Sequence, residues 1–357
     1  MKENIQQTAL TKHFRALGTS ISLTVFGTLD QTVLEKSADL VNHYEDVLTV
    51  NRDHSQLMSV NQAAGKFPVQ VEASVYQLTK LAVEKSRANF GFNAAIGPLV
   101  KLWHIGFSDA KVPSEQQISE RLSLIDPWQI ELNDADQSIF LKKAGMEIDL
   151  GAIAKGYIAD RIQDLWHAYG IACGIINLGG NLLMVGKPPH HYDGLWRIGL
   201  RSPFSDNDEP IAVVTMPPCS AVTSGIYERR LTSGQKSYHH ILDSNTGYPR
   251  DNNLNSVTVF SKKSVTAEIE TTRLFFAGEP LPDYPFEQDV FGAAFITKDC
   301  QIKLSGIAPG QIRLLDSHYQ IICRTKDATG KKSRFTLELN EMSNKICPFA
   351  ADFVRHF

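Results

Sequence analysis

Residues 149–180 read DLGAIAKGYIADRIQDLWHAYGIACGIINLGG, and this stretch decides the fold class. Its apolar residues recur at helical spacing after Asp149, which predicts a helix that ends near Gly170 as a C-cap. The run Ile171 to Leu178 then predicts a buried strand that leads into Gly179-Gly180. The helical stripe consists of Ile153, Tyr157, Ile158, Ile162, Leu165 and Trp166.

The rest of the chain adds strands and helices in a mixed order. Apolar spacing predicts helices over Val33 to Leu48, Val75 to Ala88 and Val265 to Ala277. Ser264 is the expected N-cap of the last helix, and Gly278 with Pro280 is its expected end. Alternating or apolar runs predict strands over Ile21 to Phe26, Trp196 to Leu200, Ile211 to Met216, Ser256 to Ser261 and Val290 to Ile296. This order favours one continuous α+β domain of mixed sheets with packed helices over a regular βαβ succession.

Composition excludes several function classes. The chain has 357 residues, 43% hydrophobic and 21% charged, as in ordinary globular proteins. A net charge of -3 argues against a nucleic-acid partner. Five widely spaced cysteines without a Cys-x-x-Cys pair argue against a disulfide framework and a structural zinc site. The N-terminus shows no leader and the chain no membrane-spanning run, so we expect a cytoplasmic protein without a membrane partner.

The segment Asp149 to Asp160 carries two glycines and Lys155 at a predicted helix start. Free N–H groups and the helix dipole favour a phosphate there, and Lys155 could neutralise pyrophosphate oxygens. A capped surface helix with a solvated lysine is the alternative. Neither a Walker A loop nor a Gly-x-Gly-x-x-Gly fingerprint is present. Asn177-Leu178-Gly179-Gly180-Asn181 would let backbone approach a ligand closely, although a plain tight turn explains it nearly as well.

Two further segments are rich in polar side chains. Thr223 to Arg229 leads through a polar loop to Tyr238–Pro249, whose histidine and turn glycines suit a ligand site. The His239-His240 pair invites a zinc interpretation, but adjacent histidines on a strand point to opposite faces. Glu268 and Thr272 are four apart on a predicted helix, so their oxygens could both reach a hard cation such as Mg²⁺. Solvated glutamates with a packed Thr272 would be the alternative.

These segments, in this order, resemble the ApbE family of FAD:protein FMN transferases. The resemblance runs from about Arg15 to about Ala277 and rests on five separated motifs. It implies a single ApbE-like, T-fold-like domain over 15–315, with an N-terminal extension over 1–14 and a peripheral C-terminal segment over 316–357. The motifs are Ala16 to Thr19, Phe90 to Trp103, Asp149 to Asp160, Asn177 to Asn181, and Thr223 through Gly247 to Thr272.

The resemblance also implies a site. Asp149 and Lys155 match FAD-contacting residues, and the polar-loop pair His240 and Ile241 has its backbone near the nucleotide. The implied ligands of Mg²⁺ are the carbonyl of Ala152 and the side chains of Glu268 and Thr272. The remaining implied flavin contacts are Leu17, Asn51, Gly91, Phe92 and Asn93.

The implied reaction is Mg²⁺-dependent transfer of FMN from FAD to a threonine of an acceptor protein, with release of AMP. Lys155 would offset phosphate charge, and His240 is the candidate base because a histidine pKa can lie near the operating pH. The acceptor is expected to be a separate, soluble flavin-dependent reductase. Family acceptors carry Asp-(Gly/Ser)-x-x-(Ser/Thr)-Gly-Ala-(Thr/Ser), which does not occur here.

Some positions depart from the family pattern. Asn51 stands where many members have a tyrosine that packs on the nucleotide, so water could reach the pyrophosphate. Glu268 replaces the usual Asp, Leu17 the usual Met, and Arg273 a small residue. Two alternatives therefore stay open: a Mg²⁺-dependent FAD pyrophosphatase that yields FMN and AMP, and a non-catalytic flavin-binding protein. Retention of Lys155, His240 and Thr272 argues against the second.

Overall fold

The computed structural model describes residues 8–203, 209–281, 284, 286–326 and 332–337. Parts of the expected N-terminal extension and C-terminal segment therefore lie outside the described residues. Within these ranges, no helix combines the length and the apolar character that crossing a membrane requires.

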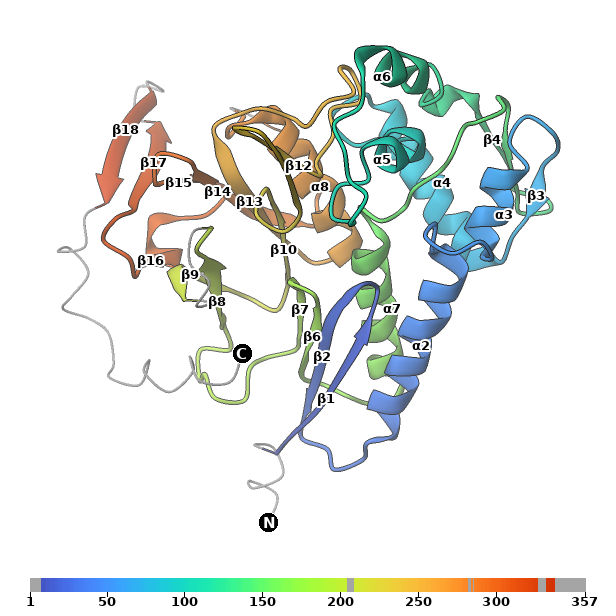
Figure 1. Ribbon diagram of the computed structural model, residues 1–357. Helices are drawn as coiled ribbons and strands as arrows, with labels where there is room; N and C mark the ends of the chain where they lie inside the picture. Colours follow the sequence, from blue (N-terminus) through green and yellow to red (C-terminus); the bar gives the residue numbers. More distant parts are fainter. Residues whose placement is uncertain (1–7, 204–208, 282–283, 285, 327–331, 338–357) are drawn as a thin grey trace.

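A ten-stranded sheet runs through the molecule (Figure 1). Its neighbouring strands pair antiparallel except β15 and β17, which are parallel, so the sheet is mixed. Together with the helices it makes one α+β architecture, as the sequence predicted. The strand order is β1 (Ala9–Ala16), β2 (Thr19–Phe26), β6 (Gly174–Leu178), β7 (Asn181–Val185), β10 (Ser220–Gly225), β13 (Leu254–Ser261), β14 (Val290–Thr297), β15 (Gln301–Ser305), β17 (Gln320–Lys326) and β18 (Lys332–Leu337).

Smaller sheets complete the β structure. One has the order β3 (Val69–Gln70), β5 (Ser138–Leu141), β4 (Ile130–Asn133). A second has the order β16 (Ile312–Leu314), β9 (Pro210–Met216), β8 (Trp196–Arg201), and β11 (Arg230–Ser233) pairs with β12 (Lys236–His239). The helices are α2 (Thr32–Leu48), α3 (Gln56–Gln62), α4 (Ala73–Arg87), α5 (Gly97–Trp103), α6 (Glu115–Leu122), α7 (Ala154–Ala168) and α8 (Ser264–Ala277), with short 3₁₀ turns at Pro127–Gln129 and Pro309–Gln311.

Side chains alternate between the two faces along each strand of the large sheet, and other elements cover both faces at its centre. On β13, Val257 and Val259 pack under α8 with Phe275, whereas Phe260 faces the opposite side. That opposite side is covered by β8, β9 and β16, where Ile198 lies in the same core as Phe260. In Figure 1, α2, α7 and α8 lie on one side of the sheet and the three-stranded β8–β9–β16 layer on the other.

Helices α2 and α7 are joined by two specific contacts. Trp166 Nε1 donates to Ser37 Oγ at 2.9 Å, and both side chains are buried. The rings of Tyr44 and Tyr157 meet edge to face, with centroids 5.5 Å apart. Because the packing fixes the position of α7, it also fixes the glycine- and lysine-containing turn at its N-terminus.

The structure corrects two sequence expectations. Lys263 is the N-cap of α8, and Ser264 is already its first helical residue. The capping acceptor comes instead from another helix, because the Asp160 carboxylate on α7 accepts from the N–H groups of Ser264 and Val265 at 2.7 and 3.0 Å. Strand β6 begins at Gly174 rather than Ile171, since the N–H of Ile171 is used by the α7 C-terminus through Trp166 O.

The chain ends also join the large sheet where they are described. Strand β1 contains residues 9–14 of the expected N-terminal extension and pairs with β2 along its full length. Strands β17 and β18 lie within the expected C-terminal segment and form the other edge of the same sheet. Tyr319 and Ile321 are buried in the core beneath β8, β9 and β16.

Candidate functional site

Two hairpin turns meet at one end of the large sheet. Leu17 and Gly18 connect β1 to β2 with φ of 54° and 70°, the positive values of a two-residue primed turn. Gly179 and Gly180 connect β6 to β7, and a Cβ on Gly179 would lie 2.4 Å from Thr19 Oγ1. The glycine is therefore required for the two turns to touch, and it places Leu17 beside the second hairpin.

The second hairpin leads directly to the predicted cation ligand Glu268. Asn181, the first residue of β7, is 2% exposed, and its Nδ2 donates to Glu268 Oε1 at 2.8 Å. Glu268 is buried on α8, and the Nζ of Lys155 lies 3.8 Å from the same Oε1. The predicted pair of Lys155 and Glu268 is thus brought together from two helices.

The close approach of α7 and α8 depends on Gly156. A Cβ at this position would lie 2.5 Å from Ser264 O and 2.7 Å from Glu268 Cγ. One turn further along α8, the Thr272 hydroxyl donates to the carbonyl of Glu268 at 3.1 Å. Its oxygen lone pairs remain open to a further partner, which suits a cation ligand.

The turn before α7 is tied by Asp149. Its Oδ1 accepts from the N–H of Gly151 at 2.8 Å, and its own N–H donates to Ala94 O at 2.9 Å. Burial raises the pKa of Asp149, an effect opposed by the Gly151 N–H and by the positive charges of Lys101 and Arg229. The contact with Ala94 places the predicted segment Gly91-Phe92-Asn93 next to this turn.

Within that segment, the side chains have structural partners. Gly91 lies against Phe276, because a Cβ at this position would be 2.4 Å from Phe276 Cβ, and its φ is +73°. The ring of Phe92 is 3% exposed. The Asn93 amide donates to Ile125 O at 2.9 Å and accepts from the N–H of Ala95 at 2.9 Å. Any contact of this segment with a ligand would therefore use its backbone.

The loop that carries His240 is anchored beyond the histidine. Trp103 Nε1 on α5 donates to Gly247 O at 2.8 Å. Arg250 pairs with Asp243 at 3.0 Å and donates to Phe276 O at 3.0 Å. These contacts hold the loop between α5 and the C-terminal end of α8.

His240 lies in a buried, electropositive environment. Its Nδ1 is buried and has no hydrogen-bond partner among the described residues. The pKa of His240 is lowered to about 4, mainly by burial and then by the positive charge of Arg229, with a smaller contribution from Lys155; a hydrogen bond with the Arg229 backbone opposes the shift. The expected pKa near the operating pH is therefore not found in the free protein, where His240 is neutral at pH 7.

Of the two remaining predicted contacts, Ile241 follows His240 in the same loop, whereas Asn51 lies in another loop. The main chain of Ile241 accepts from the N–H of Arg250 at 2.9 Å, and its N–H donates to His239 Nδ1 at 3.3 Å. Asn51 is exposed in the loop between α2 and α3, and its N–H donates to Thr49 Oγ1 at 3.2 Å. In the described part of the chain, no hydrogen bond or ion pair joins Asn51 to Lys155 or Glu268.

The predicted cation ligands fit a hard divalent ion by their chemistry. All three are oxygen donors, of a kind that Mg²⁺ prefers. No backbone N–H in the described ranges donates to the carbonyl of Ala152, and Glu268 supplies a buried carboxylate. The described residues contain no cluster of three or more His, Cys, Asp or Glu side chains able to hold a metal ion. A site here would therefore depend on this mixed carbonyl, carboxylate and hydroxyl set.

Three residues at the ends of the sequence motifs have roles in the structure that the sequence did not indicate. Asn181 holds Glu268, Asp160 holds the start of α8, and Arg229 acts electrostatically on both Asp149 and His240. Arg229 also lies against Gly106, where a Cβ would be 2.8 Å from Arg229 Cδ. In the sequence, each of these residues is distinguished only as the last residue of a motif.

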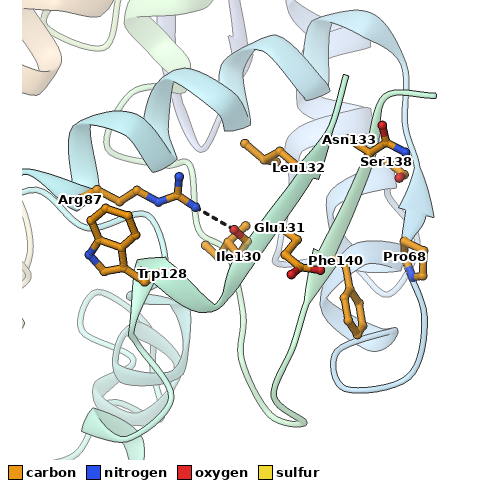
Figure 2. Close-up of a pocket in the computed structure, with 9 residues that line it drawn as sticks. All are labelled: Pro68, Arg87, Trp128, Ile130, Glu131, Leu132, Asn133, Ser138 and Phe140. Carbon is orange, nitrogen blue, oxygen red and sulfur yellow. Dashed lines mark hydrogen bonds between the residues drawn. The ribbon is translucent and has the colours of Figure 1, made fainter. Parts of the chain in front are cut away.

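A groove of about 540 Å³ lies elsewhere, along the small β3–β5–β4 sheet (Figure 2). Arg87 closes one end by donating to Ile130 O at 2.9 Å and stacking over the exposed ring of Trp128. None of the residues that line it belongs to the predicted site. The candidate site is thus defined by converging turns and helix ends rather than by this groove.

Known proteins match this chain over most of its length. The family model described as "ApbE family" matches residues 17–283. A protein of Klebsiella pneumoniae (strain 342) named FAD:protein FMN transferase is 44% identical over 297 residues, covering 82% of this chain and 91% of the relative. A protein of the same name from Treponema pallidum (strain Nichols) is 35% identical over 303 residues, covering 80% of this chain and 83% of the relative. The crystal structure of the ApbE protein of Thermotoga maritima superposes with a TM-score of 0.74 at 26% identity, covering 87% of this chain and 97% of that one.

Proposed function

The chain belongs to the ApbE family, and we propose that it is an FAD:protein FMN transferase. In this proposal, a threonine hydroxyl of an acceptor protein attacks the FMN-side phosphorus of FAD. The phosphorus–oxygen bond to AMP breaks, AMP leaves, and the hydroxyl proton passes to a base. The observation that carries the proposal is the convergence of Lys155, Glu268 and the α7 N-terminus at one end of the sheet.

The α7 N-terminus supplies favourable charge for the pyrophosphate. In the described residues, the N–H groups of Lys155 and Gly156 donate to no backbone carbonyl, as is usual in the first turn of a helix. Such groups, together with the helix dipole and the ammonium of Lys155, favour a bound anion. Lys155 would thus bind and orient the diphosphate and stabilise the charge that develops as AMP leaves.

A divalent cation, for which we propose Mg²⁺, would be held by the carbonyl of Ala152, the carboxylate of Glu268 and the hydroxyl of Thr272. When bound, it would offset negative charge on the phosphate oxygens. Glu268 is fixed by Asn181, and Thr272 by its own bond to the α8 backbone. The chain's own contribution is therefore to hold these oxygens in place before the substrate arrives.

His240 is the proposed proton acceptor. In the free protein it is neutral, and its Nδ1 has no hydrogen-bond partner among the described residues, so it can accept a proton, although its low pKa makes it a weak base. An incoming diphosphate would bring negative charge next to this imidazole and raise its pKa. Binding of FAD would thus shift His240 towards the range in which it can take the threonine proton.

Flavin contacts would come from Leu17, from the backbone of Gly91, Phe92 and Asn93, and from Asp149. These lie around the turn before α7 or beside the Gly179 hairpin. We propose Asn51 and Ile241 as further contacts at the edge of the nucleotide, on the resemblance alone. The acceptor is proposed to be a separate flavin-dependent reductase in the cytoplasm. For this chain itself, we propose that the transferase domain spans residues 15–315.

Net hydrolysis of FAD is the second candidate, and one observation favours it. Asn51 is exposed and lacks the ring with which many family members cover the nucleotide. Water could then compete with the threonine hydroxyl. The discriminating experiment supplies FAD, Mg²⁺ and an acceptor peptide with the family motif, and a matched peptide whose reacting threonine is valine. Covalent flavin on the threonine peptide alone indicates transfer. Equal AMP release with both peptides indicates hydrolysis.

A further inference from the structure

A buried set of hydrogen bonds fixes the side-chain amide of Asn181 at both ends. Its Oδ1 accepts from the Ser264 hydroxyl at 2.9 Å, and its Nδ2 donates to Glu268 Oε1 at 2.8 Å. All three residues are buried. Because the Ser264 hydroxyl donates to Oδ1, the Nδ2 group of Asn181 is directed at Glu268.

Ser264 is in turn fixed to α7. Its N–H and that of Val265 donate to the buried carboxylate of Asp160. Helix α7 also carries Lys155, and the turn that precedes it contains Ala152. The hydrogen bonds from Asp160 through Ser264 and Asn181 therefore connect the two helices that carry the proposed cation ligands.

We propose that Asn181 is a positioning residue for the divalent cation, an inference that rests on the proposed metal site. Glutamate has one more rotatable bond than aspartate, so a free Glu268 would lose more side-chain freedom when it binds an ion. The bond from Asn181 restricts Glu268 in advance and occupies Oε1. No described side chain donates to Oε2, which is left for the ion. Partners that orient a metal ligand in this way commonly change metal affinity by 10–100-fold when removed.

The test is a titration of the full chain with Mn²⁺ alone, in which free Mn²⁺ is followed by electron paramagnetic resonance. Asn181→Ala is expected to raise the Kd of Mn²⁺ by about 10–100-fold. Ser264→Ala, which leaves Asn181 in place but frees its amide to rotate, is expected to raise it less. The double variant should match Asn181→Ala, because both changes act on the same carboxylate.

Asn255→Ala is the matched control. Asn255 is also a buried asparagine, 3% exposed, and its Nδ2 donates to Thr297 O at 3.1 Å on the β13 side of the core. Its loss should lower Tm without moving the Kd of Mn²⁺. A Kd that shifts equally in the Asn181 and Asn255 variants would assign Asn181 a general structural role and overturn the inference.

A kinetic readout separates positioning from chemistry. In Asn181→Ala, the Mg²⁺ concentration that gives half-maximal FAD cleavage should rise by the same factor as the Kd. The rate at saturating Mg²⁺ should stay within about twofold, since high Mg²⁺ compensates for weaker binding. An Asn181→Ala protein with wild-type Mn²⁺ affinity would overturn the positioning role alone. A wild-type protein that binds no Mn²⁺ would instead overturn the proposed metal site and this inference with it.

Discussion

Gly156 on α7 packs directly against Glu268 on α8, because a Cβ at position 156 would lie 2.7 Å from Glu268 Cγ. The same Cβ would meet the backbone carbonyl of Ser264 at 2.5 Å, and backbone cannot move aside as a flexible side chain can. The distance between the two helices is therefore set by the absence of one methyl group. This relationship makes the proposed cation site sensitive to a change that removes no ligand.

Gly156→Ala is expected to separate α7 from α8 and to destabilise the fold by about 1–3 kcal/mol, the usual cost of overpacking. The displaced Glu268 should also weaken Mn²⁺ binding. Urea unfolding and the Mn²⁺ titration measure the two effects. Gly310→Ala is the control, because a Cβ there meets no atom within 4 Å. A Gly156→Ala protein with unchanged Mn²⁺ affinity would show that helix spacing does not govern the site.

Arg229 is expected to bind a phosphate of FAD, since its positive charge acts on both Asp149 and His240. Arg229→Met should raise the KM for FAD about tenfold, in line with the loss of one hydrogen bond to a charged group. It should also raise the pKa of His240, which NMR titration of the imidazole can follow. Arg230→Met, at the neighbouring position, should change neither quantity, because Arg230 is not among the charges that shift the pKa of His240. Equal effects of the two substitutions would point to a nonspecific charge effect.

His240 gives a pH dependence with a defined sign. Its pKa is about 4 in the folded protein and 6.5 when unperturbed, so the unfolded chain takes up the proton first as pH falls. The stability from keeping His240 neutral is therefore full above pH 6.5 and is lost as pH falls towards 4. From the size of the shift, the loss is on the order of 3 kcal/mol.

The variant His240→Gln has no titratable side chain at this position, so it should not lose this stability at low pH. We expect the free energy of unfolding of the variant, measured with urea and taken relative to the wild type, to rise by roughly 2 kcal/mol between pH 7 and pH 4.5. Burial raises the pKa of Asp160 to about 6, which acts in the opposite direction, but Asp160 is present in both proteins and its effect cancels in the comparison. A stability difference that does not change with pH would contradict the burial of neutral His240.

Local sequence patterns predicted the elements that frame the site. The apolar stripe from Ile153 to Trp166 predicted α7, and the pattern from Val265 to Ala277 predicted α8, which ends at Gly278 in the left-handed conformation. Each of these signals lies within a single element, so a local pattern can record it. The same reasoning placed the N-cap of α8 on Ser264, because a serine before an apolar run is the usual local cap.

Long-range contacts decided what the sequence could not. The acceptor that caps α8 is Asp160, 104 residues earlier in the chain, and no local pattern records that distance. The lowered pKa of His240 follows from its burial and from the charges of Arg229 and Lys155, which no local pattern records. The resemblance supplied the ligand set of Ala152, Glu268 and Thr272. The structure added the partners that hold this set, above all Asn181.

The most direct test of the account follows AMP and covalent flavin together. Purified protein, FAD, Mg²⁺ and an acceptor with the family motif should give AMP and flavin bound to the acceptor threonine in equal amounts. Glu268→Gln, which keeps the side-chain shape but removes the negative charge that the cation needs, should reduce both products by about 100-fold or more. Equal yields from the wild type, lost together in Glu268→Gln, are the predicted result. AMP without covalent flavin, or full transfer by Glu268→Gln, would contradict it.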